Sequence, residues 1–192
     1  MFVLLLALSA PAAAQVSTEW QVRPFLGVTF GGSTTLNDPD HAVGGANLAL
    51  GVGASLLGDV FGVEGELSHA PGFFQKGEAG LVSSSRVTTL TGNVIVGLPR
   101  AATEYTLRPY FVGGAGVMWA RAVDAFNEAV ATEMTRPAFD LGGGVSGALS
   151  NRTGISWDVR YFRSFAGVKD PLGIGVERLS FWRANMALVI RL

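Results

Sequence analysis

The sequence contains no cysteine, few charged residues and no long apolar run after its first residues. Without cysteine, the chain has neither a disulfide framework nor a thiolate site. Charged residues make up 15% of the chain and the net charge is -1, so nothing in the composition points to nucleic-acid binding, which would need a basic face. Glycines and charges interrupt every later stretch before it reaches the ~20 consecutive apolar residues of a membrane helix. If the protein is embedded in a membrane, it is therefore not helical.

The first residues have the pattern of a secretory signal peptide. Phe2 to Leu8 is apolar, Pro11 follows, and three alanines precede Gln15. Small residues in this position are typical of a cleavage site. We predict a signal peptide over residues 1–14 and a single barrel domain over residues 15–192.

The composition of the remainder suits membrane strands better than soluble helices. Hydrophobic residues make up 48% of the sequence, and 26 of its 192 residues are glycine. Such a chain favours strands that face lipid on one side and a tightly packed interior on the other.

The stretch Ser180 to Leu192 alternates between apolar and polar residues with a period of two. From Trp182 to Leu192 one set is entirely apolar, and the other contains Arg183, Asn185 and Arg191. Side chains alternate across a strand, so one face of this strand is continuously apolar. An uncovered strand exposes unpaired backbone groups, which predicts that the sheet closes on itself.

Similar alternation occurs in seven earlier segments, so the sequence predicts eight strands. They are Trp20 to Gly31, Ala46 to Leu57, Val60 to His69, Ser84 to Leu98, Leu107 to Ala120, Thr135 to Leu149, Gly154 to Phe165 and Ser180 to Leu192. Four connections of about 13 or 14 residues alternate with three of about 2 to 8, the asymmetry of transmembrane barrels. The third long connection, Arg121 to Met134, is predicted to hold a helical turn at Ala122 to Ala131. The fold class is thus all-β, an eight-stranded antiparallel up-and-down transmembrane barrel. The alternative, a soluble lipocalin-like barrel or sandwich, would need a better-charged exterior than the glycine-rich face offers.

The four tryptophans fall near the two predicted membrane interfaces. Trp20 and Trp157 are expected near the inner rim, and Trp119 and Trp182 near the outer rim. Amphipathic rings belong at those levels, so we predict an aromatic girdle. For the strand Leu107 to Ala120, we expect Phe111, Val117 and Trp119 outward and Tyr110 packed over Gly114 and Gly116.

The predicted interior carries polar residues of both charge signs. The candidate network, a possible gate, consists of Arg23, Glu64, Glu66, Arg136, Asp140, Asp158, Arg160 and Arg183, with Arg108 and Arg191 also facing inward. Charges away from bulk water must be paired, so a plug of ion pairs is the favoured interpretation. A gated path for protons or ions is the alternative. Eight strands leave an interior that side chains fill, which argues against a wide aqueous pore.

No motif predicts catalysis, a metal or a cofactor. Glu64 and Glu66 share a face, but no histidine or cleft accompanies them as acid-base or metal-binding chemistry would require. The runs at Gly113 to Gly116 and Gly142 to Gly144 lack the following Lys-Ser or Lys-Thr of a phosphate loop.

Two features carry a resemblance to a known family. The last strand alternates and ends on an apolar residue, and Arg108 to Tyr110 reads Arg-Pro-Tyr before a glycine-rich alternation. In these respects the chain resembles the small outer-membrane β-barrel proteins of Gram-negative bacteria, of the OmpA/OmpX or opacity type. The resemblance implies an outer-membrane location with a structural or surface-interaction role. The implied partners are outer-membrane lipid and lipopolysaccharide, an extracellular ligand at the loops, and the barrel-assembly machinery, which would act through Ser180 to Leu192.

The resemblance leaves two other functions to consider. One is a narrow, porin-like channel for ions or small solutes. The other is lipid modification, because some eight-stranded outer-membrane barrels are lipid A deacylases with a lipid-facing Ser, His and acidic group. Those enzymes carry His two residues before Ser on one strand face. Neither His41 nor His69 is placed in this way, and Ser68 lies on the face opposite His69. We therefore expect no enzymatic activity.

Overall fold

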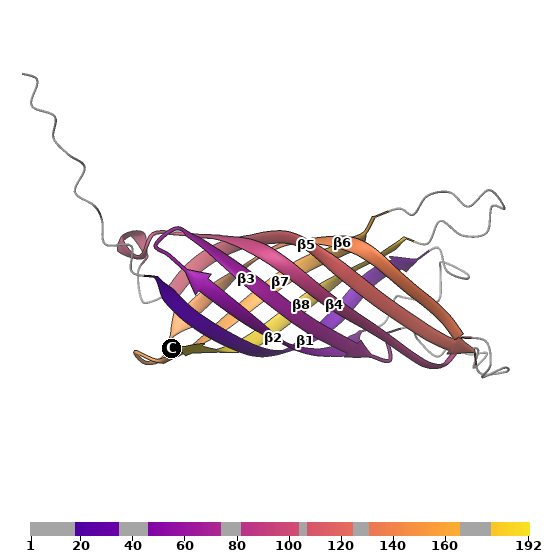
Figure 1. Cartoon of the computed structure of the whole chain (residues 1–192). Helices are drawn as coiled ribbons and strands as arrows, with labels where there is room; N and C mark the ends of the chain where they lie inside the picture. Colours follow the sequence, from indigo (N-terminus) through magenta and orange to yellow (C-terminus); the bar gives the residue numbers. More distant parts are fainter. Residues whose placement is uncertain (1–17, 35–45, 74–81, 104–106, 125–130, 166–177) are drawn as a thin grey trace, which may run out of the picture.

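The computed structural model describes residues 18–34, 46–73, 82–103, 107–124, 131–165 and 178–192. They form a closed barrel in which each strand pairs with its neighbours in chain order and β8 returns to β1 (Figure 1). The elements are β1 Glu19–Thr34, β2 Asn47–Leu57, β3 Phe61–Pro71, β4 Val82–Gly97, the 3-10 helix η1 Arg100–Ala102, β5 Leu107–Asp124, β6 Ala131–Ala148, β7 Thr153–Ser164 and β8 Leu179–Arg191. The predicted fold class is confirmed. In the described part of the chain, no helix has the length and apolarity to cross a membrane.

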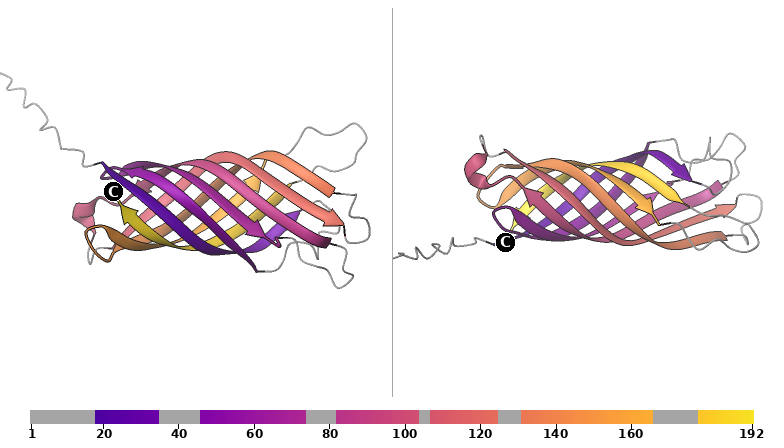
Figure 2. Two further views of the ribbon diagram at one scale, coloured as in Figure 1. Left: turned by 60° about the horizontal axis from the view of Figure 1, so that its bottom comes forward. Right: turned by 90° about the horizontal axis from the view of Figure 1, so that it is seen from above.

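The two ends of the barrel differ in their connections. At the short-turn end, residues 58–60, 98–106 and 149–152 join the strands; the opposite end, called the loop end here, is where β1, β3, β5 and β7 finish. The C terminus and η1 both lie at the short-turn end (Figure 2). In a transmembrane barrel, short turns of this kind face the periplasm.

The two-residue period of the sequence places apolar side chains outside and polar ones inside. In β1, Leu26 is 58% exposed, whereas its neighbour Phe25 is 7% exposed. In β5, Phe111 and Trp119 face outward and Tyr110 faces inward, which confirms the predicted face of that strand. The atoms nearest to the Cβ positions of Gly114 and of Gly116 belong to β4, and the packing of the Tyr110 ring over these glycines stays a prediction.

Pairing of β1 with β8 closes the barrel. The register runs from Gln21 opposite Arg191 to Thr34 opposite Leu179, with one irregularity between Phe30 and Ser33. The backbone amide of Leu192 donates to the Trp20 carbonyl at 3.0 Å. Closure removes the sheet edge, as a sheet in hydrocarbon requires.

The hairpin of β5 and β6 is longer than predicted. Their pairing continues to Val123 opposite Ala131, so residues 121–124 and 131–134 are strand where a connection was predicted. Residues 122–124 and 131 are strand, so the helical turn predicted within Ala122 to Ala131 does not lie there, and the rest of that range lies outside the described residues. Asp124 also lies opposite Val82 of β4. Cross-strand pairing thus sustains these segments although their own sequence gives little strand signal.

Candidate functional site in the barrel interior

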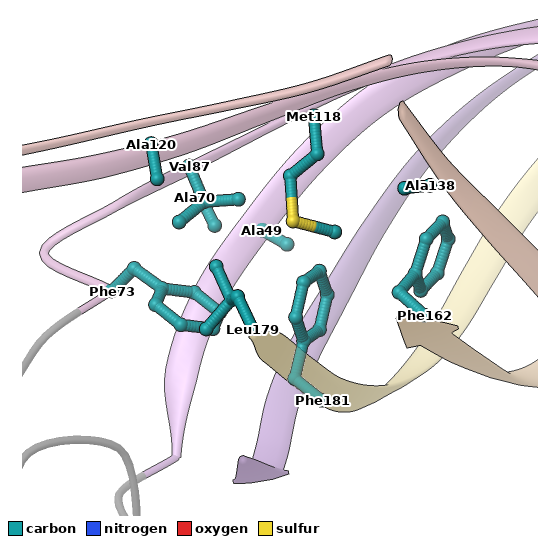
Figure 3. Close-up of a cluster of buried hydrophobic side chains, with 10 residues drawn as sticks. All are labelled: Ala49, Ala70, Phe73, Val87, Met118, Ala120, Ala138, Phe162, Leu179 and Phe181. Atoms are coloured by element: carbon teal, nitrogen blue, oxygen red, sulfur yellow. The ribbon is translucent and has the colours of Figure 1, made fainter. Parts of the chain in front are cut away.

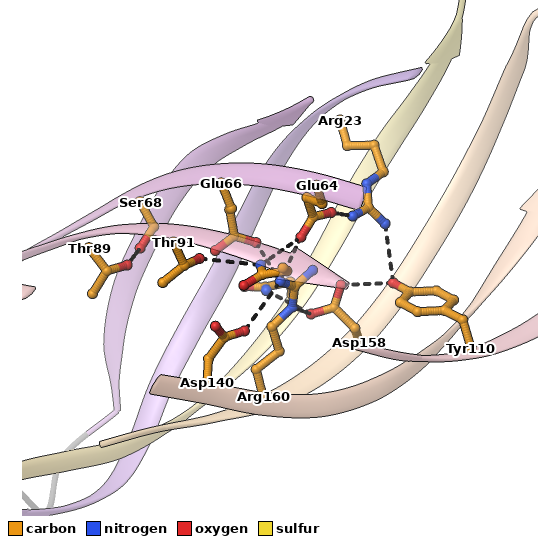
Figure 4. Close-up of polar contacts among 12 residues, drawn as sticks. Arg23, Glu64, Glu66, Ser68, Thr89, Thr91, Tyr110, Asp140, Asp158 and Arg160 are labelled. Atoms are coloured by element: carbon orange, nitrogen blue, oxygen red, sulfur yellow. Dashed lines mark hydrogen bonds and ion pairs between the residues drawn. The ribbon is translucent and has the colours of Figure 1, made fainter. Parts of the chain in front are cut away.

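A network of charged side chains crosses the middle of the barrel (Figure 4). Seven of its members were predicted, and they come from β1, β3, β6, β7 and β8: Arg23, Glu64, Glu66, Asp140, Asp158, Arg160 and Arg183. All seven are buried because alternation directs them inward from strands that surround a narrow interior.

Arg160 lies at the centre of this charged network. Its Nη1 is 2.8 Å from Glu64 Oε1 and 3.2 Å from Glu66 Oε2. Its Nε donates to Asp158 Oδ1 at 3.1 Å. One guanidinium therefore joins β3 to β7 across the barrel, using the fixed fork of donors that distinguishes arginine from lysine.

Three neutral side chains complete the charged network and were not predicted as members of it. Asn93 donates to Glu64 at 3.1 Å, Asn185 donates to Asp158 at 2.8 Å, and the Tyr110 hydroxyl donates to Asp158 at 2.9 Å. Their inward positions were evident from the alternation. Which carboxylate each one meets depends on the registers of several strand pairs, and the sequence does not state these.

Arg183 combines an ion pair with contacts to two aromatic rings. It pairs with Glu66, and its guanidinium carbon lies 4.8 Å from the Phe25 ring centre and 4.5 Å from that of Phe162. Aromatic faces attract a cation electrostatically. Arg183 therefore connects the charged network to an apolar layer nearer the loop end.

The charges of the network do not balance. Three arginines face four carboxylates, so the ionised network would carry one excess negative charge. Asp140 lies at its margin: Arg160 Nη1 is 3.6 Å away, and neither carboxylate oxygen of Asp140 accepts a hydrogen bond within the described structure.

The other predicted interior cations lie outside the network. Within the described residues, Arg136 faces inward without a hydrogen bond or ion pair. Arg108 donates to the carbonyls of Leu98, Gly58 and Asp59 and so fastens two turns together. Arg191 pairs with Glu19 at 2.7 Å, at the short-turn rim.

An apolar cluster fills the interior between the charged network and the loop end (Figure 3). It consists of Ala49, Ala70, Phe73, Val87, Met118, Ala120, Ala138, Phe162, Leu179 and Phe181. The rings of Phe162 and Phe181 stack at 5.1 Å, and Phe73 meets Phe181 edge-on at 4.9 Å. This layer was not predicted. Its signal was the loss of alternation near the loop end, where Phe162 follows Tyr161 and Phe181 precedes Trp182.

A vestibule opens below the charged network at the short-turn end. Its volume is about 460 Å³, and Arg23 and Tyr110 are among its lining residues together with Arg100, Arg108 and Arg191. Arg23 is paired with Glu64, and Arg100 with Glu19. The vestibule therefore ends at the charged network.

The four tryptophans predicted as a girdle all face outward and are 38–57% exposed. Trp20 is the second residue of β1 at the short-turn end, and Trp157 is the fifth residue of β7 from the same end. Trp182 lies near the loop end, 5.1 Å from the Tyr161 ring. Trp119 lies opposite Thr88 and Thr135 near that end. Their placement at two levels agrees with the predicted girdle, whose role at the membrane interfaces remains a prediction.

The residues considered for catalysis are held apart. Ser68 faces inward and shares a hydrogen bond with Thr89 at 2.7 Å, whereas His69 faces outward and bonds Thr88 at 2.9 Å. Glu64 and Glu66 are occupied by arginines, and no group of three or more metal-ligating side chains occurs in the described part of the chain. His41 lies outside the described residues.

Comparison with known proteins adds to this picture. The family model described as "Outer membrane protein beta-barrel domain" matches residues 1–177. The chain belongs to this family. Its members are barrels of bacterial outer membranes, which gives the location of this chain as well.

Solved structures show the same fold at low identity. Neisserial surface protein A is 12% identical, with a TM-score of 0.62 over 88% of this chain and 95% of that one. OprG from Pseudomonas aeruginosa is 14% identical, with a TM-score of 0.60 over 92% and 97%. The barrel domain of OprF from the same organism is 14% identical, with a TM-score of 0.54 over 91% and 97%. No curated protein sequence matches the chain.

Proposed function

We propose that this outer-membrane barrel is a structural or surface-interaction protein with a closed interior and no catalytic activity. The observation that carries the proposal is the filling of the barrel at two successive levels. Arg160 and its partners occupy the middle, and the Phe162 and Phe181 layer lies above them toward the loop end. Either level alone leaves little room for a hydrated ion.

The proposal also includes how the chain reaches the outer membrane and which molecules it contacts there. Residues 1–14 act as a signal peptide, and the segment Ser180 to Leu192 is the part that the barrel-assembly machinery handles. The outward face contacts lipid and lipopolysaccharide, and the connections at the loop end meet any extracellular ligand. The apolar outward face and the closed β1–β8 seam support this arrangement.

A narrow channel is the second candidate, favoured by the vestibule. It is lined by several arginines and would offer an anion an entrance from the short-turn end. Conduction would then require the charged network to rearrange.

Single-channel recording of the refolded mature chain in a planar bilayer tests the proposal. We expect silence from the wild type and from Glu64→Gln/Glu66→Gln, because the apolar layer remains intact in both. Heat-modifiable migration on a gel establishes that each protein has inserted and folded. Discrete openings that change with the variant would overturn the proposal and make the charged network a gate.

A further inference from the structure

Charge on the outward face of the barrel is confined to the loop end. The outward-facing charged side chains of the described strands are Arg86, Arg121, Glu133 and Arg163. Each lies within the last few residues of its strand toward that end. Nearer the short-turn end the outward face is apolar, as hydrocarbon requires. The inference rests on the proposed function: with the short turns toward the periplasm, these charges lie where the hydrocarbon meets the head groups of the outer leaflet.

Two of these arginines form a like-charged pair. Arg86 of β4 lies directly opposite Arg121 of β5, and the next strand places Glu133 opposite Arg121. Like charges directly opposite each other destabilise a sheet. Glu133 offsets only part of this repulsion: it meets Arg121 at 3.2 Å, while Arg86 has no ion pair or hydrogen bond from its side chain to the described residues. Arg86, Arg121 and Glu133 together therefore carry one excess positive charge.

The residues next to this pair make an amphipathic ladder along the two strands. The next outward-facing pair toward the middle of the barrel is Thr88 opposite Trp119, and the pair after that is Leu90 opposite Val117. A hollow of about 190 Å³ lies among Arg86, Thr88, Trp119, Arg121, Glu133 and Thr135. From the loop end toward the middle of the barrel, the outward face therefore presents guanidinium groups, then hydroxyls and an indole, then aliphatic side chains.

We propose that Arg86 and Arg121 bind a phosphate of lipid A in the outer leaflet. Guanidinium groups bind phosphate through paired, charge-assisted hydrogen bonds, and a dianion between the two arginines removes their repulsion. The hydroxyls of Thr88 and Thr135 and the ring of Trp119 meet the sugar, and Leu90 and Val117 meet the acyl chains. A free phosphate ion would contact only Arg86 and Arg121. The site does not depend on whether the barrel conducts.

Binding of bis-phosphorylated lipid A to the full mature chain, refolded in phosphatidylcholine nanodiscs, tests the proposal. We expect Arg86→Gln/Arg121→Gln to lower the affinity at least about tenfold, because both phosphate-binding groups are lost. Arg163→Gln is the matched control, an outward arginine of β7 outside the pair, and should change the affinity less than about twofold. Glu133→Gln should raise the affinity, because it removes the competing carboxylate.

Two further arms identify the ligand and the role of the charges. Fully dephosphorylated lipid A should bind the wild type as weakly as bis-phosphorylated lipid A binds the double variant, and millimolar inorganic phosphate should not displace the bound lipid. Equal affinity in the wild type and the double variant would overturn the proposal. An equal loss in Arg163→Gln, which would indicate unspecific attraction, or displacement by inorganic phosphate would overturn it as well. Folding of every variant is checked by heat-modifiable migration.

Discussion

Arg160 is surrounded by Glu64, Glu66, Asp140 and Asp158, and none of these carboxylates is within reach of bulk water. Removing a charge from water costs several kcal/mol of desolvation free energy. The attraction between paired charges offsets this cost only when their geometry is good. The arrangement therefore makes the loss of one partner costly for all the others.

The first prediction concerns this residue. Arg160→Met keeps the approximate length of the side chain but leaves four carboxylates with two arginines. We expect it to lower the free energy of unfolding by about 3–5 kcal/mol, because the carboxylates stay buried without their main partner. Equilibrium urea unfolding in lipid vesicles measures the loss.

Arg100→Met is the control for Arg160→Met. Arg100 also pairs with a glutamate, Glu19, but its side chain is 49% exposed at the short-turn rim. Its removal should cost no more than about 1 kcal/mol. Equal losses from the two substitutions would show that burial of the network contributes nothing to stability.

The inward direction of the charged residues could be predicted from the sequence, but their partners could not. Alternation alone places Glu64 and Arg160 inside. Their meeting at 2.8 Å joins residues 96 positions apart and depends on the registers of the intervening strand pairs. For the same reason Arg136, which has an equally inward position, was grouped with a network that it does not join in the described structure.

At the scale of the element, contact between β4 and β5 depends on inward glycines. A Cβ added at Gly116 would overlap the Leu90 carbonyl oxygen, which belongs to the neighbouring backbone. Gly92, on β4 and facing outward, has no atom within 4 Å of the same position. The two glycines lie on adjacent strands, but only Gly92 has room for a methyl group.

This difference gives the second prediction. Gly116→Ala should destabilise the barrel by about 1–3 kcal/mol, because the strands must separate to admit the methyl group. Gly92→Ala should leave stability nearly unchanged. The urea midpoints of the two variants, measured in the same vesicles, test this; an equal shift in both would mean that strand propensity rather than close packing sets the glycine positions.

Strand number and facing were predictable because lipid on one side imposes a strict period of two. Strand ends were less predictable, above all in β5 and β6, where cross-strand pairing extends the hairpin through residues of mixed character. The apolar cluster was missed because Phe162, Phe181 and Met118 face inward in segments where both faces are apolar. In those segments the alternation no longer distinguishes lipid-facing residues from inward-facing ones.

At the scale of the whole molecule, the described part of the barrel has a vestibule at its short-turn end. The vestibule reaches inward from the short turns to Arg23 and Tyr110, and beyond them the charged network and the apolar cluster follow in succession. Water should therefore reach the vestibule and no further.

The third prediction uses the absence of native cysteine. Ser146→Cys lines the vestibule, while Ser68→Cys lies buried beyond the charged network. A membrane-impermeant thiol reagent should modify Ser146→Cys from the short-turn side of proteoliposomes of known orientation and leave Ser68→Cys unmodified from either side. Mass spectrometry counts the adducts. Rapid modification of Ser68→Cys would show that water passes the charged network.

The most direct test of closure at two levels is single-channel recording of a variant that lacks both. Phe162→Ala/Phe181→Ala opens the apolar layer, Glu66→Ala/Arg160→Ala opens the charged network, and the combined variant carries all four substitutions. With folding verified by heat-modifiable migration, we expect silence from the wild type and from each two-residue variant, and discrete openings from the combined variant alone. Openings in the wild type, or in either two-residue variant, would contradict closure by two independent levels.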